Sequence, residues 1–384
     1  MNLLDYFDFI ELERPDNPFL DSDELLNKRI ELFTQNSEIG ELSEYDIIIL
    51  GIPECRNSYY KGIDAAPNAI RKELYSLIAP ETNKKILDLG NIKQGNTFKD
   101  TYFATKEVIY HLLCKNVNIV VIGGTQELTV PIYQAFEQYQ DQINLATIDS
   151  TIDYKNDVLD YNPHSYLNTI VLKKQNLFKY INLAHQTYLT ENKSLQVIKS
   201  LYHQAIRLGD LRAELPKTES ILRDIDLVSF DMSAVCQGDA PASSKPSPNG
   251  LRADEACVLS RFSGISDRLR VFFLSEIIPA NDIYHQTSKL AAQMIWYFIE
   301  GVSIRANEFP EEENGNFKTF IVSLSDLDQE IIFYRSLITG RWWFKIPSTK
   351  YDKDYIVPCN HSDYEMASMQ EVPDLWWKYY QKLN

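Results

Sequence analysis

Three short polar segments each follow an apolar run of the kind that forms a buried strand. They are residues 123–127 (GGTQE), 149–153 (DSTID) and 229–233 (SFDMS). In an open parallel sheet, ligands bind just beyond the carboxyl ends of the strands, so chemistry is expected at these segments. Positions 149, 151 and 153 alternate, and an extended backbone would aim their side chains the same way. The oxygen atoms of such side chains could bind a cation, or they could hydrogen-bond water and each other.

The elements that must position these segments are short β-branched runs separated by segments with helical periodicity. The predicted strands are 45–53, 84–90, 117–124, 143–149, 180–186, 224–232 and 269–277. Predicted helices include 67–78, where Pro67 suits the first turn, and 287–301, which Thr287 can cap and Gly301 can end. Runs that are apolar on both faces favour a mainly parallel, doubly wound sheet covered by helices, which is a three-layer α/β/α domain.

The chain divides into three predicted parts: an N-terminal helical arm (1–44), the α/β domain (45–305) and a C-terminal β-hairpin and aromatic extension (306–384). The extension begins at the acidic, turn-rich segment 307–316, continues with strands at 317–325, 329–336 and 341–347, and ends in a short aromatic helix at 373–383. Four of the five tryptophans lie in it: Trp342, Trp343, Trp376 and Trp377. Tryptophan carries a large buried area, so these side chains either fasten the extension to the α/β domain or another subunit, or form a recognition surface for a protein partner.

Composition excludes several classes of function. Hydrophobic residues make up 44% and charged residues 24% of the 384 residues, which is enough to build a large core. The net charge of −16 opposes binding to nucleic acid. No apolar stretch is long enough for membrane insertion and the N-terminus lacks a secretory signal, so a cytoplasmic location is expected. The five cysteines form no close pair, and no phosphate-binding loop is present.

The three polar segments, taken with residues 50–74 (LGIPECRNSYYKGIDAAPNAIRKEL) and 274–295 (LSEIIPANDIYHQTSKLAAQMI), resemble the ureohydrolase family of arginases, agmatinases and formimidoylglutamases. The resemblance runs over residues 45–301 in the family's order. Its signatures are GGDHS, DAHxD and SxDxD at three strand ends, where two manganese ions activate a bridging hydroxide that attacks a guanidinium or formimino carbon. The resemblance therefore implies an arginase-like fold and a homo-oligomer.

The chain departs from the family at its metal ligands. The six positions that match the family's ligands are Gln126, Asp149, Thr151, Asp153, Asp231 and Ser233. Gln126 and Thr151 stand where the family has histidine, and Ser233 stands where it has aspartate. With both imidazoles and one carboxylate missing, two manganese ions would have too few donors, so no manganese cofactor is expected.

Three interpretations of this cluster stay open. It could be a polar pocket filled with water, it could hold a hard cation such as Mg²⁺ or Ca²⁺ at Asp149, Asp153 and Asp231, or it could keep residual Mn²⁺. The first favours a non-catalytic binding, scaffolding or regulatory protein. The alternative is a metal-dependent C–N hydrolase of formiminoglutamate or a related amidine. In every case the three carboxylates repel one another, so one must be protonated or a cation must be near.

Other residues near these segments are candidates for chemistry. By the resemblance, Glu276 matches the carboxylate that holds the amidine end of the substrate. His164 could shuttle protons or be a surface residue, and Cys236 could be a nucleophile or a small core residue. Lys155 and Lys245 are the basic residues nearby in sequence, and the sequence does not say where they point.

Overall fold

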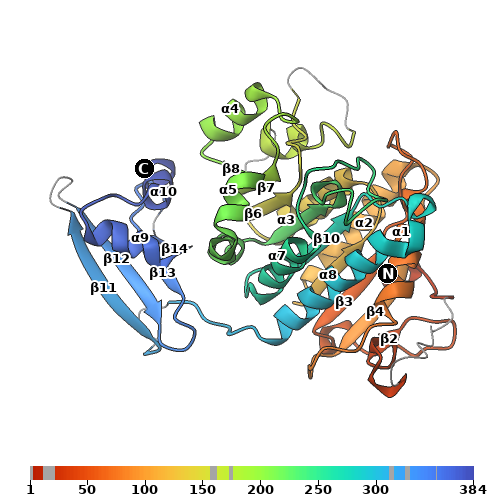
Figure 1. Ribbon diagram of the computed structural model, residues 1–384. Helices are drawn as coiled ribbons and strands as arrows, with labels where there is room; N and C mark the ends of the chain where they lie inside the picture. The colour runs from red at the N-terminus through yellow and green to blue at the C-terminus, as the bar shows by residue number, and fades with distance from the viewer. Residues whose placement is uncertain are drawn as a thin grey trace.

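The computed structural model describes residues 3–11, 22–155, 162–172, 176–310, 315–324, 329–351 and 353–384. These residues form an α/β domain and a smaller C-terminal extension, which lies to one side of it beyond the linker that follows the last long helix (Figure 1). Residues 12–21 of the predicted N-terminal arm and residues 311–314 of the predicted acidic segment lie outside the described residues.

A ten-stranded sheet with the order β1-β4-β3-β5-β10-β9-β6-β7-β8 forms the centre of the α/β domain, and β2 also pairs with β4. Its pairs are parallel except for β1 with β4. Every residue of the central strands β3, β5, β10, β9 and β6 is buried, which explains why these strands are mainly apolar on both faces. The predicted mainly parallel sheet is confirmed. The strands are β1 (Phe7–Asp8), β2 (Ile30–Leu32), β3 (Ile47–Gly51), β4 (Ile86–Ile92), β5 (Asn118–Ile122), β6 (Ile143–Ile148), β7 (Leu177–His185), β8 (Gln204–Arg207), β9 (Leu227–Asp231) and β10 (Val271–Ser275).

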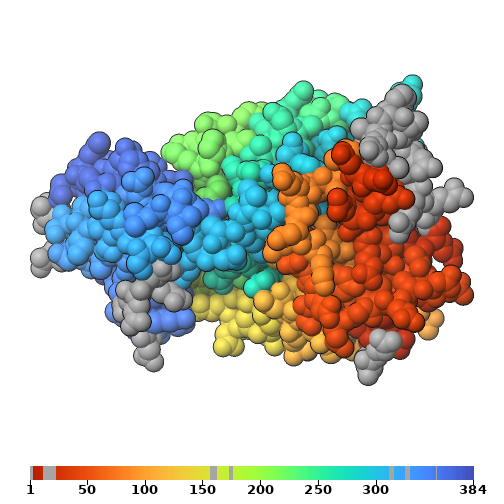
Figure 2. Space-filling view, turned by 90° about the horizontal axis from the view of Figure 1, so that it is seen from below, coloured from red at the N-terminus to blue at the C-terminus, as the bar shows by residue number. Residues whose placement is uncertain are grey.

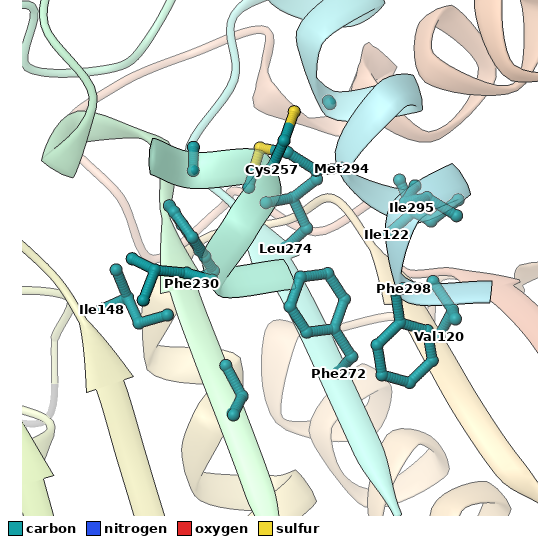
Figure 3. Close-up of a cluster of buried hydrophobic side chains, with 14 of the residues drawn as sticks. Val120, Ile122, Ile148, Phe230, Cys257, Phe272, Leu274, Met294, Ile295 and Phe298 are labelled. Carbon is teal, nitrogen blue, oxygen red and sulfur yellow. The ribbon is translucent and has the colours of Figure 1, made fainter. Parts of the chain in front are cut away.

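Helices cover both faces of this sheet, as predicted. Helices α1, α5, α6, α7 and α8 contribute to the hydrophobic core on one face, and α2, α3 and α4 contribute to the core on the other. Figure 3 shows part of the first core, where Phe272 and Leu274 of β10 meet Met294 and Phe298 of α8. Within the described ranges, no helix combines the length and the apolarity needed to cross a bilayer. The helices are α1 (Ala66–Leu74), α2 (Phe98–Leu113), α3 (Thr129–Tyr139), α4 (Asn192–Ser200), α5 (Leu208–Ala213), α6 (Thr218–Leu222), α7 (Ala253–Ile265) and α8 (Gln286–Ser303).

Helix α8 does not end at Gly301 as predicted, because it continues to Ser303. A Cβ atom at Gly301 would lie 2.6 Å from the carbonyl oxygen of Arg261 in α7. This glycine therefore allows two helices to approach closely and does not terminate one.

The N-terminal residues differ from the predicted helical arm. Their described part consists of short 3₁₀ turns and the strands β1 and β2, both of which pair with β4. The side chains of Ile30 and Leu32 are buried and that of Glu31 is exposed, so β2 has the alternation of a half-buried strand. These residues lie at the end of the molecule opposite the extension (Figure 2). The boundaries of the three predicted parts remain a prediction.

The extension is a four-stranded antiparallel sheet, with the order β11-β12-β13-β14, and two helices that contribute to a core of its own. The three predicted strands and the terminal helix are present, and β14 and α9 were not predicted. Phe178 of β7 joins this core from the α/β domain and stacks on Tyr355 with ring centroids 5.1 Å apart. The elements are β11 (Phe317–Leu324), β12 (Gln329–Ser336), β13 (Trp342–Ile346), β14 (Tyr355–Cys359), α9 (His361–Ser368) and α10 (Asp374–Leu383).

The four tryptophans of the extension have different surroundings. Trp342 and Trp343 are buried, and Arg223 of the α/β domain joins both to that domain: its guanidinium lies 4.7 Å from the ring centroid of Trp343, and its Nη1 donates to the carbonyl oxygen of Trp342 at 3.0 Å. Trp376 is buried in the core of the extension, whereas Trp377 is 40% exposed.

Candidate functional site

The order of the sheet brings the predicted polar segments to one edge. Strands β5, β10, β9 and β6 are neighbours and parallel, so their carboxyl ends lie side by side. Gln126 follows β5, Glu276 follows β10, Asp231 ends β9 and Asp149 follows β6, and all four residues are buried. The structure therefore brings together side chains that are up to 150 residues apart in the chain.

The first segment turns sharply after β5. Gly123 has a φ of 80°, and a Cβ atom there would lie 2.6 Å from Cδ of Pro67, so only glycine fits. The turn leads to Gln126, whose backbone N–H donates to Oε1 of Glu276 at 2.8 Å. Both polar atoms of the Gln126 amide are buried without a hydrogen-bond partner among the described residues. Glu276 itself has a φ of 69°, a backbone conformation that costs free energy for a residue other than glycine.

In the second segment, a threonine hydroxyl lies between two carboxylates. The Oγ1 atom of Thr151 is 3.2 Å from Oδ1 of Asp149 and 3.2 Å from Oδ1 of Asp153. The backbone N–H of Thr151 also donates to Asp149 at 2.9 Å, and Nδ2 of Asn182 donates to the carbonyl oxygen of Thr151 at 3.0 Å. The chain's own donors thus hold this pair of carboxylates.

The third segment follows the same pattern. The backbone N–H of Ser233 donates to Oδ1 of Asp231 at 2.6 Å, which caps the short 3₁₀ turn after β9. In each of the three segments, one polar residue without a carboxylate, Gln126, Thr151 or Ser233, donates its backbone N–H to a carboxylate of the site.

A lysine lies close enough to these carboxylates to feel their charge. Lys245 is half-buried on the loop between β9 and α7, and it interacts electrostatically with Asp153, Asp231, Asp149 and Glu276. Although burial alone would lower the pKa of Lys245, these four acids raise it, so the ammonium is charged at neutral pH.

Burial and mutual repulsion raise the pKa values of the acids. The pKa of Asp149 lies well above its usual range because the carboxylate is buried near the charges of Asp153 and Asp231. Burial and the charge of Glu276 raise the pKa of Asp231 to about 7, and burial raises the pKa of Glu276 to about 7. Near neutral pH the site therefore carries less negative charge than its four carboxyl groups would suggest.

The remaining candidates lie in different surroundings. His164 is partly buried, and its ring stacks on that of Tyr59 at 5.8 Å. Burial and the nearby charge of Lys245 lower the pKa of His164, so the imidazole is neutral at pH 7. Lys155 is exposed. The sulfur of Cys236 lies 3.5 Å from Oδ2 of Asp239 within the same loop, and no interaction links it to the strand-end carboxylates in the described residues.

One further acid belongs to this region and was not singled out from the sequence. Glu127 is buried beside Gln126, and the hydroxyl of Tyr102 donates to its Oε1 at 2.9 Å. Burial raises the pKa of Glu127 to about 7. Its only signal in the sequence is its place next to Gln126, whereas the direction of Lys245 had no signal at all.

The residues present do not fit a pair of manganese ions. The side chains at the six positions offer oxygen and amide groups and no imidazole, and the ammonium group of Lys245 interacts electrostatically with the carboxylates. Among the described residues, no group of three or more His, Cys, Asp or Glu side chains is arranged to hold a metal ion.

Comparisons with known proteins find relatives that share about two thirds of this chain. Formimidoylglutamase from Ralstonia nicotianae is 23% identical over 265 residues, which span 65% of this chain and 81% of that protein. Agmatinase from Blochmanniella floridana is 23% identical over 276 residues, which span 65% of this chain and 86% of that protein.

Two solved structures share the fold. The formimidoylglutamase of Bacillus subtilis superposes with a TM-score of 0.67 at 18% identity, covering 77% of this chain and 97% of that one. The formiminoglutamase of Trypanosoma cruzi, solved with Mn²⁺, superposes with a TM-score of 0.64 at 19% identity, covering 70% of this chain and 97% of that one. The α/β domain therefore has the arginase-like fold. The sequence model of the Arginase family matches residues 45–300, and this chain belongs to that family.

Proposed function

We propose that this arginase-family chain is a non-catalytic protein that acts in binding, scaffolding or regulation. The observation that carries the proposal is the hydroxyl of Thr151, which lies 3.2 Å from both Asp149 and Asp153. By the resemblance, these two carboxylates match metal ligands of the family, and here a neutral hydroxyl of the chain lies between them.

The other acids of the site support the same proposal. Oδ1 of Asp231 accepts the backbone N–H of Ser233, and Oε1 of Glu276 accepts that of Gln126. Such hydrogen bonds satisfy one buried oxygen of each carboxylate without a metal ion. A water molecule at this place would lack the pair of ions that lowers the pKa of a bound water toward 7.

The relatives favour a second candidate, a metal-dependent hydrolase of formiminoglutamate or a related amidine, because they are named formimidoylglutamases and an agmatinase. That function would need residual Mn²⁺ or a hard cation such as Mg²⁺ or Ca²⁺ at Asp149, Asp153 and Asp231. For this second function, the metal cation would have to bind despite its repulsion by the ammonium group of Lys245.

Metal content and hydrolysis distinguish the two functions. The full chain, purified without chelator and dialysed against Mn²⁺, should carry well under one equivalent of manganese by elemental analysis and should not hydrolyse formiminoglutamate, agmatine or arginine. Close to two equivalents of manganese together with turnover of any of these amidines would overturn the proposal.

A reconstructed ligand set provides the matched comparison. The triple variant Gln126→His, Thr151→His, Ser233→Asp should bind Mn²⁺ more tightly than the wild type, because it supplies two imidazoles and one carboxylate at the strand ends. Thr151→Val is the control, since it removes the hydroxyl without adding a ligand and should not gain affinity. Equal affinity in the triple variant and the wild type would contradict the alignment of these positions with metal ligands.

A further inference from the structure

The loop that carries Lys245 is fixed against the end of β10. The carbonyl oxygen of Ala242 accepts the backbone N–H of Ile278 at 2.8 Å, and the backbone N–H of Ser244 donates to the backbone carbonyl oxygen of Glu276 at 3.0 Å. Between them, Ser243 forms an antiparallel bridge with Ile277. Residues 242–244 thus run as a short strand beside 276–278. The backbone of Lys245 follows directly after Ser244, which pairs with Glu276 just beyond the end of β10.

A second set of contacts fixes the two sides of the same loop. The backbone N–H of Ala242 donates to Oγ1 of Thr287 at the start of α8, at 2.9 Å. On the other side, Nε2 of Gln186, after β7, donates to the carbonyl oxygen of Asn249 at 3.1 Å. The path of the loop across the sheet edge therefore depends on contacts with α8 and with the residues that follow β7.

Charge at this edge would be unbalanced without the lysine. Asp149, Asp153, Asp231 and Glu276 are all buried, and like charges at such a place cannot all ionise without a nearby cation. Free oxygens remain on three of these acids, since Oδ2 of Asp153, Oδ2 of Asp231 and Oε2 of Glu276 have no hydrogen-bond partner among the described residues. No ion pair within 4.0 Å joins Lys245 to these acids in the described residues, but an ammonium group has three donors and can reach such oxygens through a bridging water.

We propose that the ammonium group of Lys245 takes the place of the metal ions as the counter-charge of this site. The four carboxylates are then held together by a cation that is part of the chain, and a free divalent cation competes with that ammonium for the same oxygens. This inference rests on the proposed function, because it gives the physical reason why the strand ends need no metal.

Three single variants of the full chain test it. Lys245→Met keeps the length of the side chain and removes the charge, and Lys245→Arg keeps the charge. Lys155→Met is the control, because it removes the charge of an exposed lysine that follows the second polar segment. Each protein is freed of metal with a chelator, and its melting temperature is then measured with and without Mn²⁺, Mg²⁺ or Ca²⁺ at about 1–10 mM, a concentration that reveals weak binding by mass action.

The expected result is specific to the charge. Lys245→Met should melt at least about 4 °C below the wild type, a shift within the range of single substitutions. Mn²⁺ should restore part of that loss in Lys245→Met, because the vacated carboxylates then accept the ion. The wild type, Lys245→Arg and Lys155→Met should show no comparable response. Equal melting temperatures of Lys245→Met and the wild type, or a response of the wild type as large as that of Lys245→Met, would overturn the inference.

A double variant keeps the test decisive if Lys245→Met does not fold. Asp153 is the acid with the strongest attraction to Lys245, so Lys245→Met combined with Asp153→Asn removes one charge of each sign. The double variant should be more stable than Lys245→Met, or soluble where that variant is not. A double variant that is no better would show that the shape of Lys245 matters and its charge does not. Amidine hydrolysis by the wild type would count against the proposed function. The melting temperatures test the role of the Lys245 charge independently, because they do not depend on any enzymatic activity.

Discussion

Replacing Trp376 should weaken the extension far more than replacing its neighbour Trp377, although both belong to α10. Trp376 is fully buried, its Nε1 donates to the carbonyl oxygen of Lys345 at 3.1 Å, and its ring stacks on Tyr380 at 4.9 Å. Trp377 is 40% exposed and stacks on the same Tyr380 with ring centroids 5.7 Å apart. The two variants Trp376→Ala and Trp377→Ala are therefore matched in chemistry and helix propensity and differ in burial.

The magnitude follows from burial. A buried tryptophan hides about 200 Å² of surface, which at about 25 cal/mol per Å² gives an upper bound of about 5 kcal/mol. Large-to-small changes of this kind measure about 3 to 5 kcal/mol, and the lost hydrogen bond leaves the carbonyl oxygen of Lys345 without its donor. Trp377→Ala should cost about 1 kcal/mol or less, as surface substitutions do. A difference of at least about 2 kcal/mol, a factor of about 30 in the local unfolding equilibrium, is expected.

Hydrogen exchange is the suitable measurement, because a chain with two parts is not expected to unfold in a single two-state transition. Amide exchange in β12 and β13, followed by mass spectrometry, reports the opening of the extension by itself. Trp376→Ala should speed exchange in these strands, and Trp377→Ala should leave it nearly unchanged. Equal exchange in the two variants would refute the reasoning from burial. Trp377→Ala also tests the predicted recognition surface, because a protein partner bound there would be lost while exchange stays the same.

Two further predictions concern charge and assembly. The folded-state pKa values of Asp231 and Glu276 are raised to about 7, whereas in the unfolded chain these acids titrate near pH 4. Their contribution to stability is therefore fully present below about pH 4 and is lost as the pH rises through about 7. Denaturant titrations from pH 5 to 8 should show that loss, amounting to a few kcal/mol, and Asp231→Asn should make the profile flatter; an unchanged profile would contradict the raised pKa. Truncation before Phe317 exposes the surface around Arg223 that the buried Trp342 and Trp343 cover, so the shortened chain should be insoluble or change its oligomeric state by light scattering, and an unchanged, soluble assembly would contradict a fastening role.

The sequence predicted the central sheet well because its strands carry a strong local signal. Residues 47–51, 118–122 and 271–275 are mostly apolar, with Asn118 and Ser275 at strand ends, and the structure buries every residue of these strands. Strand β8 was missed because Gln204–Arg207 is short, partly exposed and polar at both ends. Strands β1 and β2 were missed for a different reason. They have only two and three residues, which is too short to show an alternation of apolar and polar residues, and they are held in place by pairing with β4.

The candidate site was predictable only in part. Its strand-end positions follow from the topological rule for parallel sheets, and the neighbouring strands β5, β10, β9 and β6 bring them together. The direction of Lys245 was not predictable, because it depends on pairing between residues 242–244 and 276–278, more than 30 residues away. The bridging position of the Thr151 hydroxyl likewise depends on side-chain geometry that a motif does not encode. That these positions correspond to former metal ligands, and that no metal binds there, both remain predictions.

The stability of the fold and the chemistry of its sheet edge are separable in this chain. The cores on the two faces of the sheet consist of strand and helix side chains such as Val120, Phe272 and Phe298, which do not take part in the site, so their packing does not depend on a metal ion. The repulsion between buried carboxylates is confined to the strand ends at this edge, and there the chain supplies hydroxyl, amide and ammonium donors of its own. Without such donors, the buried carboxylates would repel one another at a cost in stability. The acids at this edge are therefore held by donors of the chain, whereas the stability of the fold comes from its cores.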